Sequence, residues 1–164
     1  MSEGTAVPYV RRWAITQLQA ATGLAGVRVQ YSPITNFDQA LGDNGNIEAV
    51  YWDRFTSSIQ PRAFKGAAHI KYRETASSDL IVVVAERNAD ATLSDAEQRA
   101  ANLVGEVVRV WQSGQPGSPG AHLDNISTYI AAIEADPGIL ASAGSSVYAA
   151  SWRLTVHIEA NVEQ

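Results

Sequence analysis

The C-terminal segment from Val147 to Val162 alternates between apolar and largely polar positions over its whole length. A period of two is typical of a β-strand that is buried on one face only. Strands of ~5–6 residues are the most common, so a strand of this length indicates a sheet that reaches beyond its own core, or a bent strand. The apolar positions are Tyr148, Ala150, Trp152, Leu154, Val156, Ile158, Ala160 and Val162; the polar ones are Ser151, Arg153, Thr155, His157, Glu159 and Asn161.

Two other segments have the periodicity of amphipathic helices. The first begins near Pro8, which suits a first helical turn, and its pattern stops at Gly23. The second is predicted over residues 95–112, where Ser94 and Glu97 match a capping box. The Gly- and Pro-rich residues 114–120 end this second helix.

Shorter segments complete the predicted sheet. Alternation predicts strands over residues 27–31, 47–55 and 69–75, and the apolar run 80–85 predicts a central strand covered on both faces. Residues 126–135 fit either a strand or a helix, and we favour a strand because it mirrors the last strand across the loop 136–146.

Three connections are predicted from composition. Residues 36–46 are expected to be a structureless link, and residues 56–67 a long loop. Residues 76–79 are expected to form a turn that joins the strands 69–75 and 80–85 in a hairpin.

The order of these elements predicts an α+β fold, with a mainly antiparallel or mixed β-sheet and two main helices packed on one face. A length of 164 residues suits one domain, over residues 1–164, with a sizeable core. The N-terminus lacks the basic and apolar regions of a secretory signal, and the run 80–85 is too short to span a bilayer. We therefore expect a soluble protein that is not exported by this route.

The composition argues against most chemistry. Charged residues make up only 18% of the chain and the net charge is −5, so general attraction to nucleic acid is not expected. There is no cysteine, and His69, His122 and His157 occur singly, so neither a metal site nor a cofactor is predicted. The segment 117–120 does not fit a serine nucleophile elbow. We expect no enzymatic activity.

Aromatic and basic residues allow two interpretations. Trp13, Trp111 and Trp152 lie on predicted apolar faces and are expected in the core, whereas Trp52 fits either the core or an interface. Basic residues concentrate only at Arg11–Arg12 and at Arg62 with Lys65. A solvated face is favoured over contact with an acidic partner at both places.

The order of elements and several segments resemble tail terminator proteins of long-tailed, siphovirus-type bacteriophages, especially those that infect actinobacteria. The resemblance covers most of the chain. It is carried by the leading helix that ends near Gly23, by Val27–Pro33, by Ile81–Val84, by Asp95–Ala100 and by Trp152–Ile158.

The resemblance implies a structural virion protein in the neck region, assembled in the host cytoplasm. Such a subunit would form a homohexameric ring that caps the head-proximal end of the tail tube and stops tube polymerisation. Its partners would be the tail tube protein and the head-completion or connector protein, while DNA passes through the lumen without specific binding and no membrane is involved. Two alternatives stay open: another neck protein, such as a head–tail connector or head-closure subunit, and a small-ligand-binding α+β domain.

Two groups of residues are candidates for interfaces. Arg62, Phe64 and Lys65 on the expected loop are predicted to reach a neighbouring subunit or the tube. Arg153, Thr155 and His157 on the polar face of the last strand are predicted to line the ring or to pack between subunits.

Overall fold

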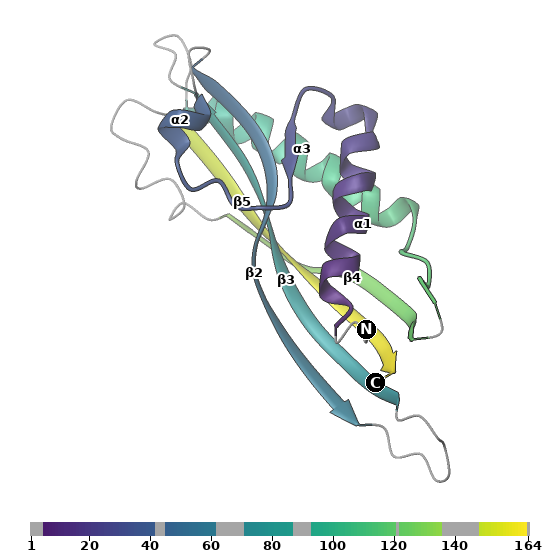
Figure 1. Ribbon diagram of the computed structural model, residues 1–164. Helices are drawn as coiled ribbons and strands as arrows, with labels where there is room; N and C mark the ends of the chain where they lie inside the picture. The colour runs from purple at the N-terminus through teal and green to yellow at the C-terminus, as the bar shows by residue number, and fades with distance from the viewer. Residues whose placement is uncertain are drawn as a thin grey trace.

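The computed structural model is built on a five-stranded sheet in the order β1-β2-β3-β5-β4 (Figure 1). The structure describes residues 5–41, 45–61, 71–86, 93–120, 122–135 and 148–163. β2, β3, β5 and β4 are antiparallel neighbours, whereas β1 runs parallel to β2. The strands are β1 (Arg28–Gln30), β2 (Asn46–Pro61), β3 (Lys71–Glu86), β4 (Leu123–Ala135) and β5 (Tyr148–Glu163).

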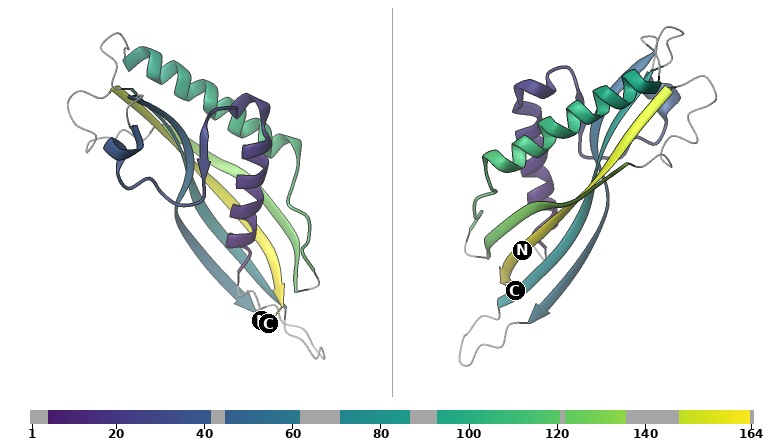
Figure 2. Two further views of the ribbon diagram at one scale, coloured as in Figure 1. Left: turned by 45° about the horizontal axis from the view of Figure 1, so that its top comes forward. Right: turned by 180° about the vertical axis from the view of Figure 1, so that it is seen from behind.

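Both long helices, α1 (Val7–Ala20) and α3 (Leu93–Ser113), cover the same face of the sheet, as Figure 2 shows. We call this the helical face and the opposite one the polar face. A 3₁₀ turn, Thr22–Leu24, follows α1. The predicted fold class is confirmed: the chain is a single compact α+β domain with a mixed, mainly antiparallel sheet.

The core lies between the helical face and the two long helices. The apolar positions of β5 from Leu154 to Val162 are buried, as the alternating pattern predicted. Trp111 of α3 packs edge-on against Trp13, with ring centroids 5.8 Å apart, and against Trp52, at 6.4 Å. Trp52 is fully buried, so it belongs to the core, and Trp152 packs at the core margin.

A small second core covers the upper part of the polar face. It is made by the short helix α2 (Phe37–Leu41), whose Phe37 and Leu41 pack against β2 and β3. The prediction of a structureless link over residues 36–46 is therefore wrong. Asn36 Oδ1 accepts a hydrogen bond from the Gln39 backbone N–H at 3.0 Å and starts this helix. Strand residues 80–85 are buried from both sides, as predicted.

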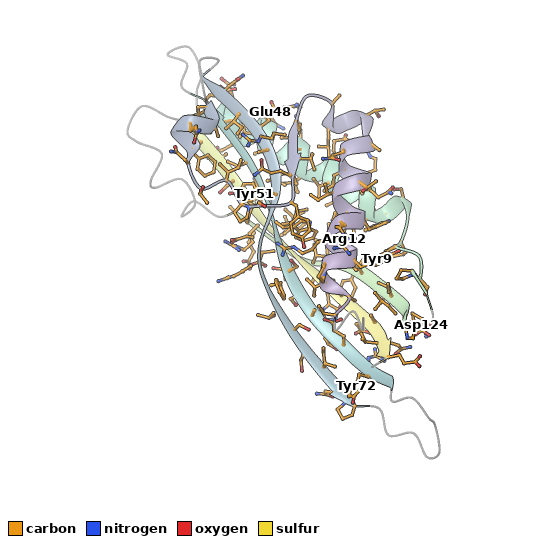
Figure 3. All side chains as sticks on the ribbon, viewed as in Figure 1. Tyr9, Arg12, Glu48, Tyr51, Tyr72 and Asp124 are labelled. Carbon is orange, nitrogen blue, oxygen red and sulfur yellow. The ribbon has the colours of Figure 1, made fainter. Side chains whose placement is uncertain are left out.

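The lower parts of β2 and β3, residues 54–61 and 71–79, lead past the start of α1, and β5 stays paired with β3 along this stretch (Figure 1). We call these parts of β2 and β3 the arm. The loop prediction fails over residues 56–61, which belong to β2, and the turn prediction fails over residues 76–79, which lie inside β3. The hairpin is thus formed by β2 and β3 and not by two halves of β3. Figure 3 shows Tyr72 near the far end of this arm, away from Glu48 at the other end of the sheet.

The physical reason for both errors is the sheet's environment. Residues 54–61 of β2 are exposed on both faces, so their strand carries no apolar alternation. Within β3, Ser78 and Asp79 are buried polar residues whose side chains bond to neighbouring strands. Composition suggests a turn wherever small polar residues cluster, although cross-strand contacts can hold the same residues extended.

Candidate functional site

A cluster of charged side chains occupies the centre of the polar face. Asp79 of β3 accepts from Arg54 Nε at 2.8 Å and from Arg153 Nη1 at 2.6 Å. Arg153 also lies 3.2 Å from an Asp53 carboxylate oxygen, and Thr155 Oγ1 lies 3.4 Å from Asp79. The cluster sits at a β-bulge between Trp52 and Phe55, which turns Arg54 toward the neighbouring strand.

A second group lies lower on the same face. The His157 ring is 5.0 Å from the Tyr129 ring, and His157 Nε2 lies 3.4 Å from Glu159 Oε1. Glu159 also forms an ion pair with Arg73. The hydrogen bond to His157, and then the charge of Arg73, lower the pKa of the Glu159 carboxyl.

The structure brings the predicted residues Arg153, Thr155 and His157 together on one face. Each is partly buried and makes contacts within its own chain. Their role in an interface between subunits stays a prediction. Arg62, Phe64 and Lys65 lie outside the described residues.

Charges are paired in the centre and lower part of the polar face. Arg54, Arg73 and Arg153, which lie there, each form an ion pair with a carboxylate. A basic strip that would grip nucleic acid is therefore not part of the described face. Within the described ranges, no three His, Asp or Glu side chains are grouped so that they could hold a metal ion.

The outer edge of β2 is paired along only part of its length. β1 covers Ala49, Val50 and Tyr51, and just beyond it Arg11 Nη2 of α1 donates to the Asp53 carbonyl at 2.8 Å. Between Arg54 and Pro61, no described strand pairs with this edge.

Arg11 is an unexpected part of this edge. The sequence placed it on a solvated face, but it is buried, with its guanidinium carbon 4.9 Å from the Tyr31 ring centroid, 5.2 Å from that of Trp52 and 5.6 Å from that of Phe55. Burial lowers its pKa, although Tyr31 and Asp53 act in the opposite direction. Arg12 is exposed, as predicted, and projects from α1 in Figure 3.

The other edge of the sheet, β4, is also closed at one end. The Gln115 side-chain amide donates to the Thr128 carbonyl and accepts from the Thr128 N–H, both at 3.0 Å. Ser118 Oγ donates to the Leu123 carbonyl at 2.7 Å. The Gly- and Pro-rich segment 114–120 thus satisfies backbone groups of β4 as far as Thr128, a role that its sequence did not indicate.

Glu74 is a buried carboxylate that the sequence also did not reveal. It accepts hydrogen bonds from the Ala6 backbone N–H, from Thr5 Oγ1 and, at 2.7 Å, from Ser57 Oγ. A carboxylate at a helix N-terminus satisfies an otherwise unpaired donor and interacts favourably with the helix dipole. Glu74 thereby fastens the start of α1 to the arm.

A groove of about 530 Å³ lies between α3 and the upper part of β5. Its described lining is mostly short side chains, such as Ala101, Ala149 and Ala150, and Glu97 is the only ionisable residue among them. A single carboxylate does not make the pair of groups that acid–base catalysis requires. This groove therefore gives no specific support to an enzymatic function.

No family model matches the sequence, and no curated protein matches it either. None of the described helices is both long and apolar enough to cross a membrane.

Proposed function

We propose that this chain is a structural virion protein that caps the head-proximal end of a phage tail tube as a ring. In this role it terminates tube polymerisation and joins the tail to the head-completion complex. The proposal starts from the sequence resemblance to tail terminator proteins and from the single α+β domain that the resemblance implied.

The observation that supports it most is the distribution of unpaired surface. The helices cover one face of the sheet, which leaves much of the polar face and one stretch of each edge strand uncovered by described elements. A subunit with unsatisfied surfaces on two different sides is suited to head-to-tail contacts, which close into a ring when the rotation permits.

The charge of the polar face is compatible with a DNA passage. In its centre and lower part Arg54, Arg73 and Arg153 are paired with Asp79 or Glu159, and the whole chain carries a net charge of −5. A lumen lined by such a face would let DNA slide without holding it, because binding to DNA depends on unneutralised cations.

Arrest of tube growth tests this function. Tail tube protein from the same viral genome is allowed to polymerise, and the chain is added during growth while light scattering is followed. We expect growth to stop at a substoichiometric ratio of chain to tube protein, because only tube ends bind it. Unchanged growth at an equimolar ratio would exclude the terminator role.

Particle location separates the terminator from the other neck proteins. Antibody labelling of assembled virions should place the chain directly on the last ring of the tube. Labelling on the capsid side of isolated tail-less heads would instead support a connector or head-closure subunit.

A further inference from the structure

We propose that copies of this chain join through their sheet edges, with the lower edge of β2 in one copy pairing with the upper edge of β4 in the next. This inference deepens the proposed function, on which its biological setting rests, by naming the contact between subunits. The lower edge of β2 means residues 54–61 and the upper edge of β4 means residues 129–135.

Each of the two stretches begins where contacts from the same chain stop covering the strand edge; we call these covering contacts the caps. On β2, strand β1 and then Arg11 occupy the outer edge up to Asp53. On β4, Gln115 and the segment around it occupy the edge up to Thr128. Beyond these two caps the described residues provide no further partner strand, so alternate backbone N–H and C=O groups face outward.

Exposed apolar residues coincide with the uncapped stretches. Phe55 and Ile59 lie on the lower edge of β2 and are 49% and 38% exposed. Tyr129 and Ile133 lie on the upper edge of β4 and are 53% and 44% exposed. Tyr31, at 38%, is the fifth large exposed apolar residue of the described chain, and it shares the Arg11 guanidinium with Phe55. Edge strands of monomeric proteins are usually protected by charges or covered, so exposed apolar side chains along both edges indicate a partner.

The direction of the strands fits a second copy of this chain. Each step from β2 to β3, from β3 to β5 and from β5 to β4 is antiparallel, so β4 runs opposite to β2. Rotation about an axis that runs roughly parallel to the strands keeps their direction from copy to copy. β4 of one copy therefore meets β2 of the next in antiparallel fashion. Because the two edges differ, the contact is heterologous and can continue around a ring.

Register adds a geometric condition. Phe55, Ser78, Val156 and Ile130 form one row across the sheet. From this row the lower edge of β2 extends toward the tip of the arm, whereas the upper edge of β4 extends the opposite way. Full pairing therefore needs a stagger between copies, which is the shear that a closed sheet of tilted strands requires.

The charges at the two edges are also complementary. Arg54 is the first residue of the lower edge of β2, and its side chain is 75% exposed despite its bond to Asp79. Glu134 is exposed on the upper edge of β4 and is in register with Arg153, on the polar face. An antiparallel contact brings these opposite charges to the same face of the joined sheet.

Charged substitutions at each edge test the contact. Ile59→Lys adds a charge to the β2 edge, Ile133→Lys adds one to the β4 edge, and Asn102→Lys adds one to the exposed surface of α3 as a control. Sedimentation over a concentration series should show multimers for the native chain and for Asn102→Lys. Each edge variant should remain folded by circular dichroism, with a dissociation constant raised by at least about tenfold.

Mixing the two edge variants makes the test specific. Ile59→Lys keeps an intact β4 edge, and Ile133→Lys keeps an intact β2 edge. These two edges can pair with each other, whereas the remaining two edges are both altered, so an equimolar mixture should form a one-to-one dimer and nothing larger. If the mixture stays monomeric while the native chain assembles, or if each variant assembles like the native chain, edge pairing is wrong.

Cross-linking covers the case of weak association. The chain contains no cysteine, so Ser58→Cys on β2 and Ala131→Cys on β4 introduce the only thiols. A short bis-maleimide should join these two variants to each other at least about tenfold faster than it joins Ala131→Cys to an Asn102→Cys control. Equal rates would overturn the proposal. This result is independent of tube binding, so a failure here and a failure to arrest tube growth are distinguishable.

Discussion

Arg153 Nη1 lies 2.6 Å from Asp79 Oδ2, diagonally across the two central strands β3 and β5. Both side chains are largely buried, at 17% and 11% exposure. Asp79 also accepts a hydrogen bond from Arg54 Nε, so this one carboxylate links β2, β3 and β5 at the point where β2 bulges. We call this group of contacts the junction; it links β2, β3 and β5 through side chains, in addition to their backbone pairing.

Asp79→Asn should weaken this junction. The amide keeps the shape but removes the charge that pairs two arginines, and hydrogen bonds to charged groups contribute about 1.5–3 kcal/mol each. We expect the free energy of unfolding, measured by urea titration, to fall by about 2–3 kcal/mol. The matched change Glu97→Gln, at an exposed position of α3, should cost less than about 1 kcal/mol. Equal losses for the two variants would contradict the role of the junction.

Glu74→Gln should loosen the start of α1. The side-chain oxygen of glutamine can still accept two of the three hydrogen bonds that Glu74 accepts. The variant loses the negative charge at the helix N-terminus, whose interaction with the helix dipole contributes up to about 2 kcal/mol when partly buried. Hydrogen exchange followed by mass spectrometry should therefore be faster in the first turn of α1, with residues 103–110 of α3 as the internal reference. Unchanged exchange at residues 7–10 would show that Glu74 does not fasten this helix.

Two glycines should respond in opposite directions to alanine. Gly26 has a φ of +82°, so Gly26→Ala should destabilise the fold by about 1 kcal/mol. Gly105 lies on the exposed side of α3, where an added methyl group would meet open space beyond the helix's own backbone, so Gly105→Ala should stabilise the fold by about 0.5–1 kcal/mol. Thermal unfolding measures both, and a loss of stability in Gly105→Ala would indicate a contact on that side of α3.

Glu159 should titrate below an ordinary glutamate. Its pKa is lowered from 4.5, chiefly by the hydrogen bond to His157 and further by Arg73. A carboxyl whose pKa is lowered in the folded state stabilises the fold above its ordinary pKa, and this contribution disappears as the pH falls through the lowered value.

An NMR titration of the Glu159 side-chain carboxyl measures this shift. The midpoint should lie below 4.5 in the native chain and rise toward that value in His157→Gln and in Arg73→Gln. Glu159→Gln should remove the corresponding loss of thermal stability on the acid side of the pH profile. A midpoint at or above 4.5 would contradict the described pairing.

Periodicity sufficed to predict the elements that pack against one another. The helices α1 and α3, the long strand β5, and the doubly buried part of β3 all present apolar positions to a neighbour, and burial imposes the period that the sequence records. The same argument placed Trp111 in the core, whereas Trp13 is partly buried and packs against it. A mainly antiparallel or mixed sheet with both helices on one face follows from these elements. The number of strands does not, because the predicted strands 69–75 and 80–85 both belong to β3.

The arm and its contacts could not be predicted in this way. Residues 56–61 are exposed on both faces, so no burial pattern marks them as a strand. Arg11, Glu74 and Gln115 act on backbone or side-chain atoms far away in the chain, such as Gln115 on Thr128. Such partners become visible only when the topology is known, because sequence spacing carries no information about them.

Electron microscopy of tail tubes tests the central claim most directly. Tubes assembled from the tail tube protein of the same genome would be imaged with and without the purified chain. The proposed function predicts a ring of this protein on one end of each tube and a narrower distribution of tube lengths. Tubes with both ends bare and an unchanged length distribution would contradict it.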